Sequence, residues 1–336
     1  MNDLTIEEAA AVPVSGHRFG GVFFWLRAAL GGLLILIVLR MIDYQRLMAT
    51  LISVQPQVIA VALLVMMLNF IIKTYRWSFV LRSQRPDITF LQLARLNFAS
   101  LFLGNFLPTS ISYDIVRVYY VSKCAVDPRV AISSIFADRL IGHFSIAMSA
   151  LLAFVALKLT GVFAIGPVFS FGIGAFLLLS LGLPLALCNR RVANALRSVL
   201  DRFSGRKVFE SVQDFSKHLF FYWEHAPVLG KALGIAFLNL LLAVFEYYLI
   251  GVAFSAQVSL AYFFLFIPLV IFLSMLPVSV SGIGLVEGGL VLFFSQVGMP
   301  PEMCLGLAML HRALQLVCIL PGGAVYILDG LPKFST

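Results

Sequence analysis

Charged residues are scarce in this chain. They make up 12% of its 336 residues, against roughly 25% in an ordinary soluble protein. Hydrophobic residues make up 61%, and apolar runs long enough to cross a bilayer recur from Val22 almost to the C-terminus. The alternating pattern of a membrane β-barrel is absent. The composition therefore predicts an all-α polytopic protein of the cell (inner, cytoplasmic) membrane.

Several chemical motifs are also missing. The four cysteines form no CxxC pair and the five histidines form no HxxxH or HExxH pair, so we predict neither a disulfide framework nor a metal site. A GxxxxGK[ST] phosphate-binding loop is absent, which argues against a nucleotide-driven machine. We expect no cofactor and assign no catalytic residue.

The N-terminus has no basic region ahead of its first apolar run and carries Asp3, Glu7 and Glu8 instead. We therefore expect a retained first span rather than a cleaved signal peptide, with residues 1–21 as a cytoplasmic segment. The net charge of +8 arises in loops that flank the apolar runs, where basic residues set orientation and contact anionic headgroups. It does not indicate a nucleic-acid partner.

Hydropathy predicts about six full spans, at residues 22–40, 51–72, 130–157, 164–187, 230–252 and 303–328. Loop charge predicts that both termini lie in the cytoplasm, together with a 73–87 loop that carries Lys73, Arg76, Arg82 and Arg85. The chain then divides into a first membrane half (22–188), a connector (189–229), a second membrane half (230–328) and a C-terminal tail (329–336).

One short motif occurs twice, as Phe106-Leu107-Pro108-Thr109-Ser110-Ile111-Ser112 and as Met275-Leu276-Pro277-Val278-Ser279-Val280-Ser281. Matching helix breaks in two halves of a membrane protein are typical of a transport site. We expect re-entrant helical hairpins near 88–122 and 260–297, broken at Pro108, Ser110, Pro277, Ser279, Ser281, Gly282 and Gly284. Three full spans between the motifs predict an inverted internal repeat, whereas one span more or fewer would make the repeat parallel.

The connector has the pattern of a basic amphipathic helix. Val208, Val212, Phe215 and Leu219 recur at helical spacing among basic residues. We expect residues 190–228 to lie on the inner leaflet and contact its anionic lipids. A plain connector that rides on the membrane surface, without sensing lipid, is the alternative.

Ionisable residues at membrane depth are functional candidates, because burying a charge there costs on the order of 2.5–3.5 kcal/mol. The candidates for substrate binding are Asp114, Arg117, Asp138, Arg139, Glu287, His311 and Arg312, and Glu246 also lies within an apolar run. The arginines could clamp a phosphate beside half-helix N-termini. Alternatively, the charges pair with each other, Arg139 or Arg117 with Asp114 and Arg312 with Glu287, and only hold the hairpins in place.

These residues resemble a known family, the transmembrane region of lysylphosphatidylglycerol synthases. The resemblance rests on the stretches Asn105–Ile111, Asp114–Arg117, Ala137–Gly142, Ser274–Ser279, Ser281–Gly288, His311-Arg312 and Pro321–Gly323, and it runs over residues 20–330. It implies a membrane-embedded lipid translocase without an aminoacyl-transferase domain. The implied substrate is an anionic phospholipid or a polyprenyl-linked lipid, and membrane lipids are the expected partners.

Two other function classes remain open. A membrane enzyme could use Ser281 with His311, but Ser279 stands where an intramembrane serine protease has glycine. A lipid-linked sugar transferase would need an acidic motif in a sizeable outer loop, and the predicted outer loops are short. The third class is a non-catalytic scaffold or regulator of a lipid- or glycan-modifying enzyme, docked through 190–228.

Overall fold

The computed structural model of the chain describes residues 54–105, 112–123, 126–160, 174, 178, 221–222, 225–274 and 282–329. Within these ranges the fold is entirely helical. It has eight α-helices and one 3-10 helix: α4 (Pro56–Arg82), α5 (Phe90–Asn105), α6 (Ser112–Lys123), α7 (Pro128–Thr160), α11 (Ala226–Ala253), α12 (Leu260–Ser274), α13 (Leu285–Phe294), η2 (Ser295–Val297) and α14 (Pro301–Asp329).

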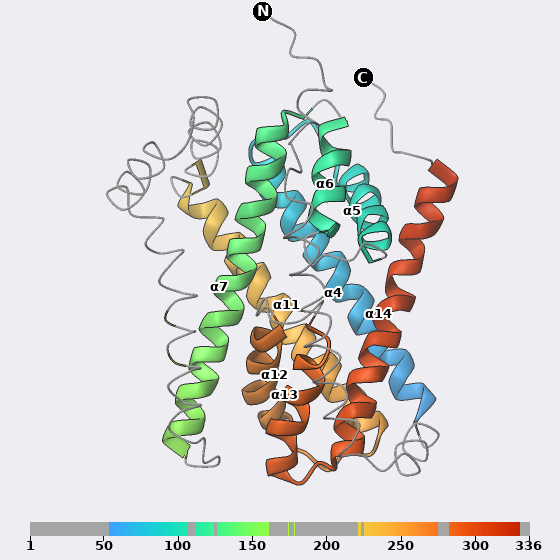
Figure 1. The fold of residues 1–336 in the computed structure, drawn as a ribbon. Helices are drawn as coiled ribbons and strands as arrows, with labels where there is room; N and C mark the ends of the chain where they lie inside the picture. Colours follow the sequence, from blue (N-terminus) through green and yellow to red (C-terminus); the bar gives the residue numbers. More distant parts are fainter. Residues whose placement is uncertain are drawn as a thin grey trace, which may run out of the picture.

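Among the described helices, four are long and apolar enough to cross a membrane: α4, α7, α11 and α14. They run along the long dimension of the molecule (Figure 1). Large apolar side chains such as Leu64, Leu152 and Ile327 are exposed on their outer faces, as expected where the surrounding solvent is lipid. The predicted spans 130–157, 230–252 and 303–328 coincide with α7, α11 and α14.

Helix α4 corrects one prediction. The sequence placed a span at 51–72 and a cytoplasmic loop from residue 73, but the helix continues to Arg82. The apolar run ends before Lys73, but the helix does not end with it. The charge of Arg76 is compensated within the packed helices by Asp138 of α7, whose Oδ1 lies 2.7 Å from Arg76 Nε. Lys73 and Arg76 therefore lie within a membrane-spanning helix and not in a loop.

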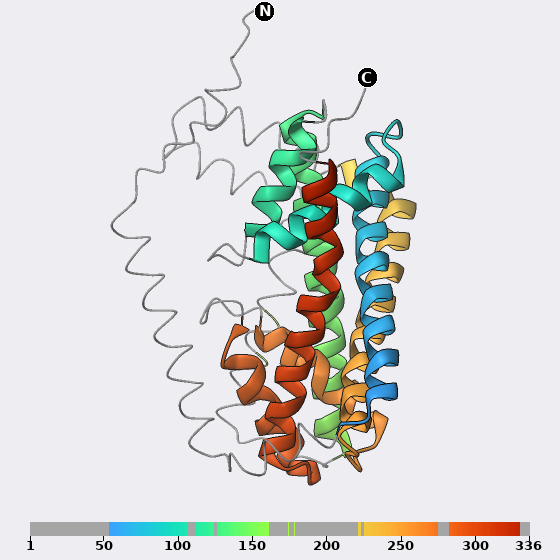
Figure 2. The ribbon, with the colours of Figure 1, turned by 90° about the vertical axis from the view of Figure 1, so that its right-hand side faces the viewer.

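Helices α4 and α11 pack side by side, at the right-hand edge of the view in Figure 2. The amide Nδ2 of Asn239 on α11 donates to Oδ1 of Asn69 on α4, at 2.8 Å, and lies 3.2 Å from the Asn69 carbonyl oxygen. A second contact joins their ends, where the Gln55 amide donates to the Ala253 carbonyl at 3.1 Å. Hydrogen bonds between amides are a common way for membrane helices to associate.

Two pairs of shorter helices lie toward opposite ends of these long helices (Figure 1). Helices α5 and α6 pack against each other at one end, and α12 and α13 do so at the other. The intervening residues 106–111 and 275–281, which include Pro108, Ser110, Pro277, Ser279 and Ser281, lie outside the described residues. Gly282 and Gly284 lie just before α13 and have φ angles of 70° and 83°, a conformation that glycine adopts without strain.

The helix pair α5–α6 is held against α14 at a point where no side chain fits. A Cβ atom on Gly322 would lie 2.0 Å from the carbonyl oxygen of Phe98 on α5. Glycine therefore allows the backbones of α5 and α14 to approach closely. Pro321 precedes it within α14, so the Pro321-Gly322-Gly323 stretch marks a helix crossing.

The turn between α4 and α5 lies outside the membrane spans and is polar. Arg85 Nη2 lies 2.8 Å from Asp87 Oδ2, and this hydrogen bond lowers the pKa of the exposed Asp87 carboxyl below its usual value. Thr89 precedes α5, and its backbone amide and hydroxyl both donate to the Gln92 side-chain oxygen, as in a capping box.

The remaining domain predictions lie largely outside the described residues. These are the segment 1–21, the spans 22–40 and 164–187, the connector 189–229 with its surface helix, and the tail from residue 330. The last residues of the predicted connector belong to α11, which begins at Ala226.

Candidate functional site

A first cluster of charged side chains forms where α4, α6 and α7 meet. It contains Lys73, Arg76, Asp114, Arg117, Asp138 and Arg139. Asp138 is buried, with Arg76 Nε 2.7 Å from its Oδ1 and Arg117 Nη2 3.8 Å from its Oδ2. Asp114, in the first turn of α6, forms an ion pair with Arg139. Two carboxylates thus face four cations.

Arg117 is the most enclosed member of the first cluster, with 1% of its surface exposed. Its guanidinium carbon lies 4.2 Å from the centre of the Trp77 ring, a cation–π contact. Its Nη1 donates to the hydroxyl of Tyr113, which in turn donates to Asn97 Oδ1. These contacts give Arg117 a fixed place in the protein core.

A second cluster forms where α11, α13 and α14 meet. It contains Glu246, Tyr247, Glu287, His311 and Arg312. Arg312 Nε lies 2.9 Å from Glu287 Oε1, and the other oxygen of Glu287 accepts a hydrogen bond from the Gly284 amide at 2.7 Å. This arrangement closes the N-terminus of α13, because Gly284 is its N-cap.

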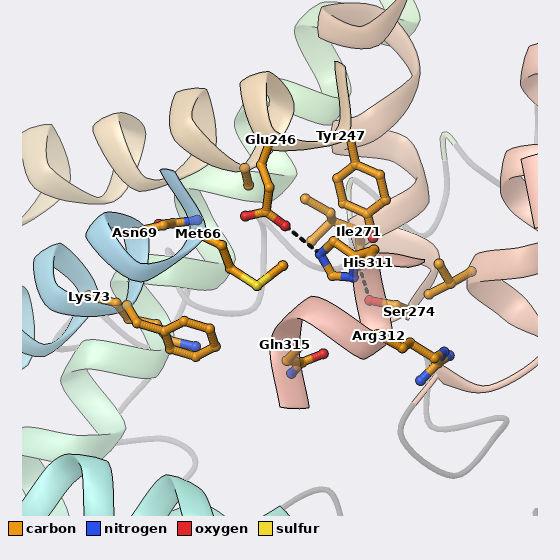
Figure 3. A pocket seen from close by; sticks show the side chains of 13 residues that line it. Met66, Asn69, Lys73, Glu246, Tyr247, Ile271, Ser274, His311, Arg312 and Gln315 are labelled. Carbon is orange, nitrogen blue, oxygen red and sulfur yellow. Dashed lines mark hydrogen bonds and ion pairs between the residues drawn. The ribbon is translucent and has the colours of Figure 1, made fainter. Parts of the chain in front are cut away.

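The second pair of this cluster joins Glu246 to His311. Glu246 is 2% exposed, and its Oε1 lies 2.9 Å from His311 Nε2. The ring of Tyr247 stacks on the imidazole, with centroids 4.3 Å apart and planes 14° apart. Figure 3 shows this group above the cavity that it borders. The stacking fixes the plane of the ring that faces the carboxylate.

Two cavities adjoin these clusters. One, of about 290 Å³, is lined by the first cluster, and we call it the first cavity. The other, of about 370 Å³, is lined by Glu246, Tyr247, His311 and Arg312, and we call it the second cavity (Figure 3). The two share four lining residues: Asn69, Lys73, Ala243 and Ile271. They therefore lie on either side of a common wall where α4 and α11 pack.

The two clusters correspond in their sequence spacing. Asp114 and Glu287 each occupy the first turn of a short helix. Glu287 and Arg312 are 25 positions apart, and the same interval separates Asp114 from Arg139. In each pair the carboxylate is buried and the arginine is partly exposed: 8% and 37% in the first, 9% and 33% in the second. The two clusters thus contain carboxylate–arginine pairs with the same sequence interval and similar burial.

The long helices α4 and α11 correspond as well. The contacting Asn69 and Asn239 are 170 positions apart, and the same interval leads from Arg76 to Glu246. Arg76 pairs with the residue before Arg139, and Glu246 pairs with the residue before Arg312. The signs of the charges are reversed between these two pairs, so the first cluster is cationic and the second is more acidic.

All seven predicted substrate-binding residues fall in one of these clusters. They form two groups rather than one, and the predicted pairing of Arg139 with Asp114 and Arg312 with Glu287 is present. Sequence reasoning missed Lys73 and Arg76, because both were assigned to a loop. Their spacing from Asn69, at i+4 and i+7 on one helical face, was an available signal.

Within the described parts of the chain, no three His, Cys, Asp or Glu side chains come together as metal ligands would. Cys304 and Cys318 are buried thiols on α14, and neither lines a cavity described above.

Comparison with known proteins identifies the family. The model of the lysylphosphatidylglycerol synthase TM region matches residues 24–322. The chain belongs to this family. Two archaeal relatives are named as UPF0104 membrane proteins. The one from Methanocaldococcus jannaschii is 20% identical, over 83% of this chain and 87% of its own length. The one from Methanothermobacter thermautotrophicus is 23% identical, over 74% and 79%. Like them, this chain is a multi-pass membrane protein.

Proposed function

We propose that this chain is a lipid translocase that moves an anionic phospholipid or a polyprenyl-linked lipid across the cell membrane. The observation that carries the proposal is the repeated ion pair, with a buried carboxylate and a partly exposed arginine, beside cavities between apolar helices. Ionisable residues that face a cavity at membrane depth are typical of substrate pathways. The lipid tails would stay in the bilayer while the headgroup crosses through the cavities.

An inverted repeat would supply the alternating access that translocation needs. Its support is the common spacing of the two clusters and the position of the helix pairs toward opposite ends of the long helices. In this proposal α5–α6 and α12–α13 are re-entrant hairpins that enter from opposite faces. The asparagine contact between α4 and α11 then lies near the axis that relates the halves.

The arginines divide into two roles. Arg139 and Arg312 are partly exposed, so each can turn from its carboxylate to the phosphate oxygens of a lipid. Nη2 of Arg312 is also a buried donor without a hydrogen-bond partner among the described residues, and such a donor favours an incoming oxygen. Arg117 is enclosed by Trp77 and Tyr113, and we assign it to positioning Asp138 rather than to substrate.

A dithionite-quench assay in proteoliposomes tests the proposal. Headgroup-labelled anionic lipids are reconstituted with the purified chain, and the protected inner-leaflet signal is followed. We expect protein-dependent loss of that signal, abolished in an Arg139→Ala/Arg312→Ala double variant that remains monodisperse. Arg82→Ala is the matched control, because Arg82 is exposed at the end of α4 and lines neither cavity.

Two outcomes would change the assignment. Mass spectrometry of the recovered lipid should show it chemically unchanged; a modified lipid would indicate an enzyme. An absence of protein-dependent scrambling with every lipid of the panel would contradict translocation by the chain alone and favour the scaffold function. Substituted-cysteine labelling of residues 190–228 then becomes the way to find a docking surface for a lipid-modifying enzyme.

A further inference from the structure

We propose that Lys73 holds the phosphate of the translocated molecule at the point where the two cavities meet. This inference deepens the proposed function and rests on it. Lys73 belongs neither to the Asp114–Arg139 pair nor to the Glu287–Arg312 pair. The ligand that it would hold is a phosphate-bearing anion of headgroup size.

The position of Lys73 is the first observation. It lies on α4 one turn after Asn69 and belongs to the lining of both cavities. Figure 3 shows it on the α4 side of the second cavity, across from Gln315 and Arg312 of α14. The neighbouring Asn69–Asn239 contact joins the two long helices at the same wall. A ligand in either cavity can therefore contact Lys73.

The pairing of the charges is the second observation. Each carboxylate of the two clusters has a partner: Asp114 has Arg139, Asp138 has Arg76, Glu246 has His311 and Glu287 has Arg312. Among the described residues, Lys73 has no hydrogen bond and no carboxylate within ion-pair distance. Its side chain is exposed to the cavity space, whereas those of Arg76 and Arg117 are buried.

The charge balance gives the sign of the missing partner. Lys73 and the four arginines Arg76, Arg117, Arg139 and Arg312 outnumber the four carboxylates, whether or not His311 carries a further positive charge. Lys73 lies in the electrostatic field of Arg76 and Arg117, which repel its charge, and of Asp138 and Asp114, which attract it. A surplus cation in an apolar span is costly unless an anion compensates it. The anionic phosphate of a lipid headgroup would supply that compensation.

The chemistry of lysine fits a substrate that must leave again. An ammonium group acts on phosphate as a point charge with freely rotating donors, while arginine fixes it with a rigid two-pronged contact. The two partly exposed arginines, Arg139 and Arg312, are each paired with a carboxylate. Lys73 can follow a phosphate from the side of Arg139 to the side of Arg312 without breaking an ion pair. We therefore place it at the transfer point.

Lipid binding to the purified chain tests this inference independently of transport. Native mass spectrometry measures binding of short-chain phosphatidylglycerol, of diacylglycerol without phosphate, and of inorganic phosphate. We expect the phospholipid to bind and diacylglycerol to bind much more weakly. Lys73→Gln should weaken phospholipid binding about tenfold or more, and Lys73→Arg should restore it, because only the charge is essential. Lys231→Gln, an exposed lysine of α11 outside both cavities, is the matched control.

The possible results distinguish the phosphate site at Lys73 from lipid translocation by the chain. The proposed phosphate site at Lys73 would be overturned by either of two results. One is that Lys73→Gln binds phospholipid as tightly as the unaltered protein does. The other is that diacylglycerol and phospholipid bind equally well. Lys73-dependent binding of inorganic phosphate at comparable affinity would retain the anion site and identify free phosphate as its source. If Lys73→Gln does not fold, the comparison of phospholipid with diacylglycerol on the unaltered chain and on Lys73→Arg still decides. Failure of scrambling together with Lys73-dependent binding would reject translocation but not the site.

Discussion

Arg312 of α14 lies 2.9 Å from Glu287 of α13, and the same carboxylate caps the helix on which it sits through the Gly284 amide. The Glu287 side chain therefore contacts both the turn at Gly284, where α13 begins, and the neighbouring span α14. Arg139 and Asp114 repeat the pair at the same sequence interval in the other half of the chain.

Two substitutions at Glu287 distinguish its contact with Arg312 from its contact with the Gly284 amide. Glu287→Gln keeps an oxygen for the Gly284 amide but removes the charge opposite Arg312. We expect at least a tenfold loss of lipid scrambling and a decrease in stability of about 1 kcal/mol, because Arg312 is partly exposed and the pair is partly screened. Glu287→Ala also removes the cap and should lower stability by about a further 1 kcal/mol. The check is unfolding in mixed detergent alongside the scrambling assay; equal stability of the two variants would argue against the cap.

Asp138 is predicted to be essential for stability rather than for substrate. It is buried between Arg76 and Arg117, and Asp138→Asn would leave both guanidinium groups without a compensating charge. Removal of one partner of a buried pair costs about 3–5 kcal/mol. We expect poor expression and a large fall in the thermal midpoint, measured with a fluorescent C-terminal fusion. The variant should recover in part when Arg76 is replaced by Gln, and failure to do so would contradict the pairing.

Gly322 offers a test of the helix crossing. Gly322→Ala would place a Cβ 2.0 Å from the Phe98 carbonyl oxygen, so α5 and α14 must separate. We expect a loss of stability of about 1–3 kcal/mol. Gly234→Ala is the matched control on α11, because its Cβ would meet nothing within 4 Å, and there alanine should be neutral or stabilise the helix slightly. Equal behaviour of the two variants in a thermal unfolding assay would refute the close approach.

The inverted repeat predicts which side of the membrane each helix pair faces. Asp87 lies in the exposed turn next to α5, and Gln296 lies in the exposed segment after α13. In a cysteine-free background, Asp87→Cys and Gln296→Cys should be labelled by a membrane-impermeant maleimide from opposite sides of oriented vesicles. Loop charge predicts that Asp87 is on the cytoplasmic side. Labelling of both positions from one side would indicate a parallel arrangement.

Sequence reasoning identified most of the charged residues that the structure gathers in the two clusters. Membrane spans follow from apolar length, and an ionisable residue in such a span stands out because of its cost. Asp114, Asp138, Arg139, Glu287, His311 and Arg312 were all found in this way, and so was the pairing of two of the arginines. Lys73 and Arg76 were misplaced because hydropathy locates the end of an apolar run, not the end of a helix.

The amino-acid sequence by itself determined that this chain is a helical membrane protein, because its apolar runs can satisfy their backbone hydrogen bonds in lipid only as helices. The repeated motif, with an acidic residue and an arginine after each copy, predicts that two parts of the chain carry related charges. The tertiary structure decided between Arg139 and Arg117 as the partner of Asp114, and it added the pairs Arg76–Asp138 and Glu246–His311. Contacts such as Asn69 with Asn239 and Arg76 with Asp138 join helices that are far apart in sequence, and no local pattern encodes that packing. Whether a lysine has a carboxylate partner depends on its neighbours in space. For this reason only the packed structure distinguishes Lys73 from the paired cations around it.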